Sequence, residues 1–84
     1  MSETRPKSWS PTRVRCLAGY RSNERPISYL IDDTEVEVRT ILESWREPDY
    51  LYFEVEAEYG GVYALRHHEY EDYWEVRESV QRRA

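Results

Sequence analysis

The stretch that most constrains the fold is Asp49–Glu58, where apolar and polar side chains alternate more cleanly than elsewhere in the chain. In an extended chain, one face of this stretch carries Leu51, Phe53, Val55 and Ala57. A period of two residues is that of a β-strand with one face in a core and the other in water. The pair Gly60-Gly61 comes soon after and is typical of a hairpin. We therefore expect Asp49–Glu58 to be the central strand of a small antiparallel sheet.

Four shorter segments show a similar alternation and predict further strands. They are Thr12–Tyr20, Ile27–Ile31, Val62–His68 and Tyr73–Arg77. Asp32-Asp33 and Glu47-Pro48-Asp49 join predicted strands. Aspartate and proline are both favoured in tight turns. In the last strand, Trp74 and Val76 are expected to point inward. The pattern predicts a meander in which consecutive strands pair.

The segment Thr34–Glu47 is ambiguous. Its first half alternates like a strand, whereas its second half places apolar residues at helical spacing. Its β-branched residues favour a strand, so we expect one continuous strand with a bend or bulge near Thr40. A helical turn over Ile41–Trp45 is the alternative.

The register of the hairpin after Ala57 has two interpretations. A two-residue loop places Arg66 opposite Val55. A longer loop places His67 opposite Val55 and also pairs Ala57 with Leu65. The longer loop is favoured because it keeps apolar side chains together on one face.

These elements predict an all-β fold. A chain of 84 residues forms one domain, and five to six short antiparallel strands can bury one face by curling into a partly open barrel, which also hides the strand edges. We expect residues 1–11 to form a flexible N-terminal arm, residues 12–78 the β domain, and residues 79–84 a frayed tail.

Charge is distributed unevenly along the chain. Residues 1–26 carry six basic and two acidic side chains, a net charge of +4; residues 27–84 carry six basic and fifteen acidic ones, a net charge of −9; the sum is −5. A basic arm on an acidic body is a pattern of interacting proteins, although the arm can also fold back on the body.

Cys16 is a lone cysteine, and there is no apolar run of signal or membrane-spanning length, so a soluble cytoplasmic protein is expected.

The segment from Arg25 to Val76 carries a pattern of short motifs. They are Arg25-Pro26-Ile27-Ser28-Tyr29, Val36-Glu37-Val38, Ile41-Leu42-Glu43-Ser44-Trp45, Tyr52-Phe53-Glu54-Val55, Gly61-Val62-Tyr63-Ala64-Leu65-Arg66-His67 and Tyr73-Trp74-Glu75-Val76. The pattern resembles an uncharacterised family of small bacterial β domains. Some of these are free-standing short proteins, and others resemble the C-terminal domain of degenerate Y-family polymerase-like subunits of mutagenic repair complexes. The resemblance implies a small β domain with an accessory, non-enzymatic role.

No stretch predicts catalysis, a metal or a cofactor. His67, His68 and Glu69 form the only cluster with ligand chemistry, but adjacent strand residues point to opposite faces and the two histidines cannot easily share one ion. Cys16 lies in a predicted strand without a nucleophile motif, so it is expected to be a small buried side chain. We therefore expect a protein that is not an enzyme.

Two groups of residues are candidates for binding a partner. Aromatic side chains exceed what a small core can hide, and an exposed aromatic patch marks a protein contact; the candidates are Trp45, Tyr50, Tyr52 and Trp74. The alternative function is weak binding of single-stranded DNA or RNA by a basic strip near aromatic rings; its candidates are Arg13, Arg15, Arg21 and Arg25. The acidic body opposes that alternative. Both a monomer and a homodimer paired through an open strand edge are compatible with the sequence.

Overall fold

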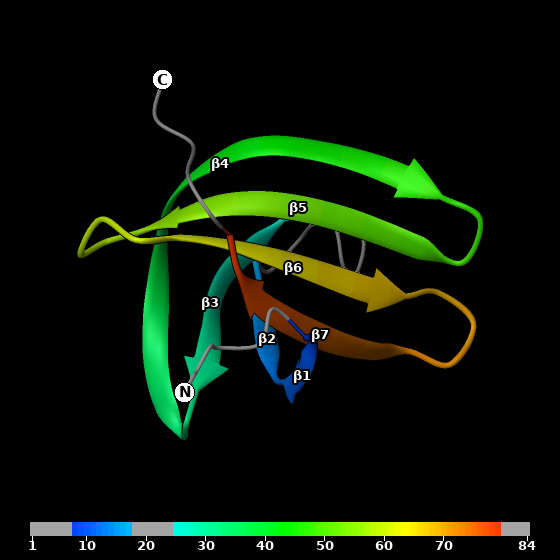
Figure 1. The fold of residues 1–84 in the computed structure, drawn as a ribbon, viewed down its shortest axis with the longest axis horizontal. Coiled ribbons are helices and arrows are strands. Elements are labelled where there is room, and N and C mark those ends of the chain that lie inside the picture. The colour runs from blue at the N-terminus through cyan, green and yellow to red at the C-terminus, as the bar shows by residue number, and fades with distance from the viewer. Residues whose placement is uncertain (1–7, 18–24, 80–84) are drawn as a thin grey trace, which may run out of the picture.

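The computed structural model describes residues 8–17 and 25–79, and its regular structure is entirely β (Figure 1). The strands are β1 (Ser10–Thr12), β2 (Val14–Cys16), β3 (Pro26–Ile31), β4 (Thr34–Glu47), β5 (Tyr50–Ala57), β6 (Val62–His68) and β7 (Tyr73–Glu78). All pair antiparallel in the order β1-β7-β6-β5-β4-β3-β2, and the sheet curls into a nearly closed barrel. The predicted all-β barrel is confirmed. There are seven strands because the first predicted strand is divided at Arg13 and its first part begins at Ser10.

The barrel closes through the segment that contains β1 and β2. β1 pairs with β7 and β2 pairs with β3, so consecutive residues join the two ends of the sheet. At the junction the Thr12 hydroxyl donates to the Leu30 carbonyl at 2.8 Å and accepts from the Leu30 N–H at 3.0 Å. A side chain thus satisfies part-buried backbone groups of Leu30 at the point where the main chain changes its neighbouring strand.

The core lies on the inner faces of the strands. Its buried members are Tyr29, Val36, Phe53, Val55, Ala57, Leu65, Trp74 and Val76. The predicted inward alternation of the central strand and of β7 is therefore confirmed. Burial of each large apolar side chain stabilises the fold by about 1.5–3 kcal/mol. Cys16 packs against this core and is half-buried.

β4 is one continuous strand, as expected, and it bends. The pairing with β5 shifts between Val38 and Thr40 and again between Ile41 and Glu43. Such bulges add one residue to one strand and increase its bend, and Figure 1 shows β4 rising from the β3–β4 turn and then sweeping along the border of the sheet. The helical alternative for this segment is not found.

Both predicted registers of the β5–β6 hairpin are wrong. Val55 lies opposite Tyr63 and Phe53 opposite Leu65. The Ala57 N–H donates to the Gly61 carbonyl at 2.7 Å, and the loop ends at Gly60 with a φ of 106°. A three-residue loop with glycine in a left-handed conformation is a common hairpin form. The favoured register placed His67 opposite Val55, whereas the structure places Tyr63 there. Tyr63 and His67 are an even number of residues apart, so the same side chains of β6 point inward in both registers.

The described part of the chain ends at Ser79, whose hydroxyl donates to the Glu54 carboxylate at 2.8 Å. Three predicted segments lie partly outside the described residues: the N-terminal arm, the end of the first predicted strand and the C-terminal tail. Arg21, which follows that strand, also lies outside them. Between residues 8 and 17 and from 25 to 79, no helix is long and apolar enough to cross a membrane.

Candidate functional site

Aromatic side chains gather on the outer face of β4–β7, opposite the core. The register places Trp45 of β4 beside Tyr52 of β5, and Tyr50 beside His68 of β6 and then Tyr73 of β7. Residues directly opposite each other on paired antiparallel strands share one face of the sheet. We call this surface, together with Trp9 from just before β1, the aromatic face; its members are Trp9, Trp45, Tyr50, Tyr52, His68 and Tyr73.

The rings of the aromatic face form two contacting groups. Trp45 stacks on Tyr52 with an interplanar angle of 3° and centroids 5.1 Å apart, and Trp9 meets Tyr52 edge-on at 6.1 Å. His68 stacks on Tyr73 at 4.9 Å. Tyr50 links the groups, because its ring lies 5.8 Å from that of Tyr52 and its hydroxyl is 3.0 Å from the hydroxyl of Tyr73. Aromatic pairs contribute about 0.5–1.5 kcal/mol beyond area burial, so the rings hold each other in place.

Arg66 anchors the centre of the aromatic face. Its guanidinium lies 4.3 Å from the ring centroid of Trp9 and 4.1 Å from that of Tyr50, and it forms a 2.7 Å ion pair with Glu75. Burial alone would lower the pKa of Arg66, but the hydrogen bond with Glu75 contributes to a net raised pKa. Arg77 adds a second cation, 4.6 Å from the Trp9 ring. Cation–π contacts of this kind are favourable, so Trp9 is held over β6 and β7.

The aromatic face is ordered but not covered. Trp45 is 39% exposed and Tyr73 is 40% exposed, while Tyr50, Tyr52 and Trp9 are half-buried among their neighbours. Rings that already occupy fixed positions lose little conformational freedom when a partner binds. The surface is therefore preorganised for contact.

Carboxylates border the aromatic face along β4 and β5. Glu43 lies directly opposite Glu54, and Glu47 lies opposite Tyr50. Among the described residues, no cation lies within ion-pair distance of Glu43, Glu47 or Glu56. Like charges directly opposite each other are destabilising in a sheet, so this border favours a cationic neighbour.

Three of the four predicted partner-binding residues come together. Trp45, Tyr50 and Tyr52 lie on the aromatic face, whereas Trp74 is 9% exposed and packs in the core against Phe53. The sequence-based prediction missed three members of this surface, Trp9, His68 and Tyr73, and also Arg66 at its centre. A correct β5–β6 register would have placed Arg66 and His68 there, because each lies opposite a predicted tyrosine. Trp9 carried no such signal, since it precedes the sheet.

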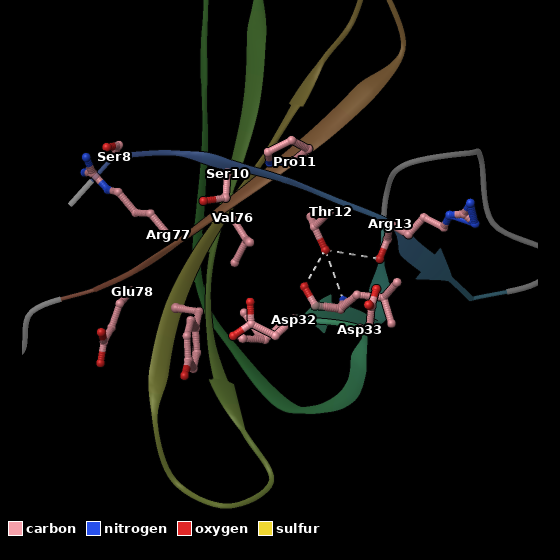
Figure 2. Close-up of a pocket in the computed structure, with 13 residues that line it drawn as sticks. Ser8, Ser10, Pro11, Thr12, Arg13, Asp32, Asp33, Val76, Arg77 and Glu78 are labelled. Atoms are coloured by element: carbon pink, nitrogen blue, oxygen red, sulfur yellow. Dashed lines mark hydrogen bonds between the residues drawn. The ribbon is translucent and has the colours of Figure 1, made fainter. Parts of the chain in front are cut away.

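The predicted basic strip is divided among acidic neighbours. Arg15 is exposed and forms a 3.1 Å ion pair with Glu35. Arg13 lines a hollow of about 1190 Å³ together with Asp32 and Asp33, and Figure 2 labels all three residues. Arg25 is exposed, and Arg21 lies outside the described residues. This region therefore presents mixed charge.

The two adjacent histidines point to opposite faces, as expected. His67 is buried in the core, with its Nε2 2.7 Å from Asp72 Oδ1, and His68 belongs to the aromatic face. In the parts of the chain that the structure describes, no group of three or more His, Cys, Asp or Glu side chains is arranged to hold a metal ion.

Comparisons of the chain with protein-family models, with curated proteins and with solved structures find no match. What the protein does is therefore inferred from its own surface. Among the residues that the structure describes, the aromatic face is the largest group of contacting, partly exposed rings, and the carboxylates beside it make its border acidic.

Proposed function

We propose that this protein is a non-catalytic binding module that recognises a protein partner through the aromatic face. The observation that carries the proposal is the parallel stack of Trp45 on Tyr52, which is fixed by its neighbours and still leaves Trp45 39% exposed. Tryptophan, tyrosine and arginine dominate the energetics of protein interfaces. All three residue types are present here in one contiguous surface.

The free-energy cost of leaving apolar rings in water supports this interpretation over a purely structural role. Rings packed only to cover the sheet would gain most by removing their apolar area from water. Trp45 and Tyr73 instead keep large exposed fractions while their stacking partners restrain them. A protein contact would complete their burial without a large ordering cost.

An accessory role in a bacterial repair assembly, and a cytoplasmic location, are parts of the same proposal. The repair role rests on the resemblance of the segment from Arg25 to Val76 to small β domains of repair-complex subunits. The cytoplasmic location rests on the lone Cys16 and on the composition of the chain.

Binding of single-stranded DNA or RNA remains the alternative. Exposed Arg13 and Arg25 favour it, whereas the ion pair of Arg15 with Glu35 and the net charge of −9 over residues 27–84 oppose it. Anisotropy titrations at low and physiological salt decide the matter, because phosphate binding weakens steeply with salt. We expect no binding even at low salt.

The proposed function is tested by selecting peptides from a displayed random library on the purified wild-type protein. Selected peptides should bind Trp45→Ala at least tenfold more weakly, because truncation of an interface hot spot typically costs about 2 kcal/mol or more. Tyr59→Ala is the matched control: Tyr59 is 65% exposed but lies at the β5–β6 loop, away from the aromatic face. Denaturant unfolding of each variant establishes that the fold persists.

Equal loss of binding in Trp45→Ala and Tyr59→Ala would contradict the proposal. So would selected peptides whose affinity survives Trp45→Ala in a folded protein. Loss in Trp45→Ala alone, with both variants folded, would support the aromatic face as the binding surface.

A further inference from the structure

The second half of β4 has a neighbouring strand on one side only. β3 pairs with β4 from Thr34 to Glu37, and β5 pairs with β4 from Val38 to Glu47. Across the described ranges, no strand pairs with the other side of Val38–Glu47, and Figure 1 shows this part of β4 as a border of the sheet. Backbone N–H and C=O groups of alternate residues on such an edge point away from the sheet, so they can pair with another chain.

The usable part of this edge is Glu43–Glu47. The bulge between Ile41 and Glu43 interrupts the strand, but from Glu43 to Glu47 the pairing with β5 continues without a shift. All five residues are exposed. A regular, uncovered stretch of this length is sufficient to guide a short extended segment into register.

The side chains along the edge define what can lie beside it. Glu43, Trp45 and Glu47 alternate on the outer face, because they lie opposite outward residues of β5. On the other face, the Arg46 guanidinium already pairs with Glu69 at 2.6 Å. A new strand would therefore place its alternate side chains next to the carboxylate of Glu43, the indole of Trp45 and the carboxylate of Glu47.

We infer that the Glu43–Glu47 edge binds an extended basic segment of a partner protein, which joins the sheet as an additional strand. The complementary segment has basic residues at its first and fifth positions and an aromatic or apolar residue at its third. This pattern is the same in both chain directions, so it fits parallel and antiparallel addition. The inference rests on the proposed function, because Trp45 belongs to both surfaces.

A second copy of this chain is a poorer occupant of the same edge. Antiparallel pairing of two copies centred on Trp45 would place Glu43 of each copy opposite Glu47 of the other. Like charges in opposite positions destabilise a sheet, and residues 27–84 of each copy carry a net charge of −9. Charge complementarity therefore selects a basic partner.

The probe is a blocked heptapeptide of sequence TKVYVKT, which carries the basic–aromatic–basic pattern on one face. We expect it to bind at low ionic strength and to slow amide hydrogen exchange within residues 43–47. The matched peptide TEVYVET should bind at least tenfold more weakly, since two exposed ion pairs are replaced by two repulsions. The double variant Glu43→Lys with Glu47→Lys should reverse this preference.

Backbone pairing is tested separately with two N-methylated forms of TKVYVKT. One is methylated on the tyrosine nitrogen and the other on the nitrogen of the following valine. Adjacent N–H groups of a strand point in opposite directions, so only one of the two methyl groups would face β4 and abolish binding. Equal affinities of the two methylated peptides, or no change in exchange at residues 43–47, would overturn strand addition.

The outcomes separate this inference from the proposed function. If library peptides depend on Trp45 but the two methylated peptides bind alike, the aromatic face stands and the edge inference fails. If library peptides are indifferent to Trp45→Ala, the proposed function fails, whatever the methylated peptides show. A wild-type dimer in sedimentation that the single variant Glu43→Lys tightens, because it places a lysine opposite Glu47 of the other copy, would assign the edge to a second copy and overturn the inference.

Discussion

The two faces of β5–β7 have similar residues and opposite environments. Phe53, His67 and Trp74 point inward and are buried, whereas their chain neighbours Tyr52, His68 and Tyr73 point outward and remain partly exposed. Both faces contain rings within contact distance of each other. The curl of the sheet makes the difference, because it encloses the inner face and leaves the outer face open. Aromatic content alone therefore does not identify a core, and the two faces should respond differently to the same mutation.

The largest difference is expected between the two tryptophans Trp74 and Trp45. Trp74→Ala removes a buried ring beside Phe53 and should cost about 3–5 kcal/mol, a large share of the stability of a small domain. Urea unfolding followed by circular dichroism measures this loss. Trp74→Phe should retain the fold if the alanine variant does not. A cost for Trp74→Ala no greater than that for Trp45→Ala would erase the distinction between the faces.

The adjacent histidines provide the next comparison. Asp72→Gly removes the acceptor of the 2.7 Å hydrogen bond with His67, and glycine tolerates the φ of 59° at this position. Leaving a polar group of buried His67 without a partner should cost about 1–3 kcal/mol in the free energy of unfolding. Asp72→Asn, which retains an oxygen and tolerates positive φ, is the control and should lose less. Equal losses would show that the hydrogen bond does not support the core.

On the outer face, Trp45→Ala should have a smaller effect on stability than on binding. The stacked contact with Tyr52 accounts for about 0.5–1.5 kcal/mol beyond area burial, and less area is lost from burial than at Trp74 because the Trp45 ring is 39% exposed. Urea unfolding gives this value, and the selected peptides give the corresponding loss of affinity. A stability loss comparable with that of Trp74→Ala would make the outer stack a second core instead of a binding surface.

The smallest effect on the free energy of unfolding is expected from the ionisation of Tyr63 and Tyr73 at high pH. The hydrogen bond with Tyr59, together with burial, raises the pKa of Tyr63 to about 12, and the hydrogen bond with Tyr50 contributes most to raising that of exposed Tyr73 to about 12. A raised pKa in the folded state gives stability that is complete below pH 10 and is lost as the pH rises through about 12. Solvent screening keeps both effects small.

Urea midpoints between pH 9 and 11.5 test this difference. Tyr63→Phe should flatten the decline of stability with pH more than Tyr73→Phe does, because Tyr63 packs against the core and Tyr73 lies on the outer face. An equal change in both variants would show that the Tyr59–Tyr63 and Tyr50–Tyr73 hydroxyl pairs contribute equally to the pH dependence of stability.

Local patterns were sufficient for much of this fold. The alternation in β5, the turn at Asp32-Asp33 and the bent strand from Thr34 to Glu47 all follow from side-chain period, turn chemistry and β-branched residues. The β5–β6 register could not be obtained in this way, because several even shifts keep the same apolar face inward. The loop that ends at Gly60 selected one of them.

The sequence by itself determined which side chains of each strand point the same way, because strand geometry alternates with a period of two. It also determined the unequal charge of the two halves of the chain. Only the tertiary structure decided which residues joined Trp45 and Tyr52 on the outer face, and which strand kept an open edge. These outcomes depend on register, bulges and barrel closure, which bring together residues far apart in the chain, as Thr12 meets Leu30 and Trp9 meets Arg66.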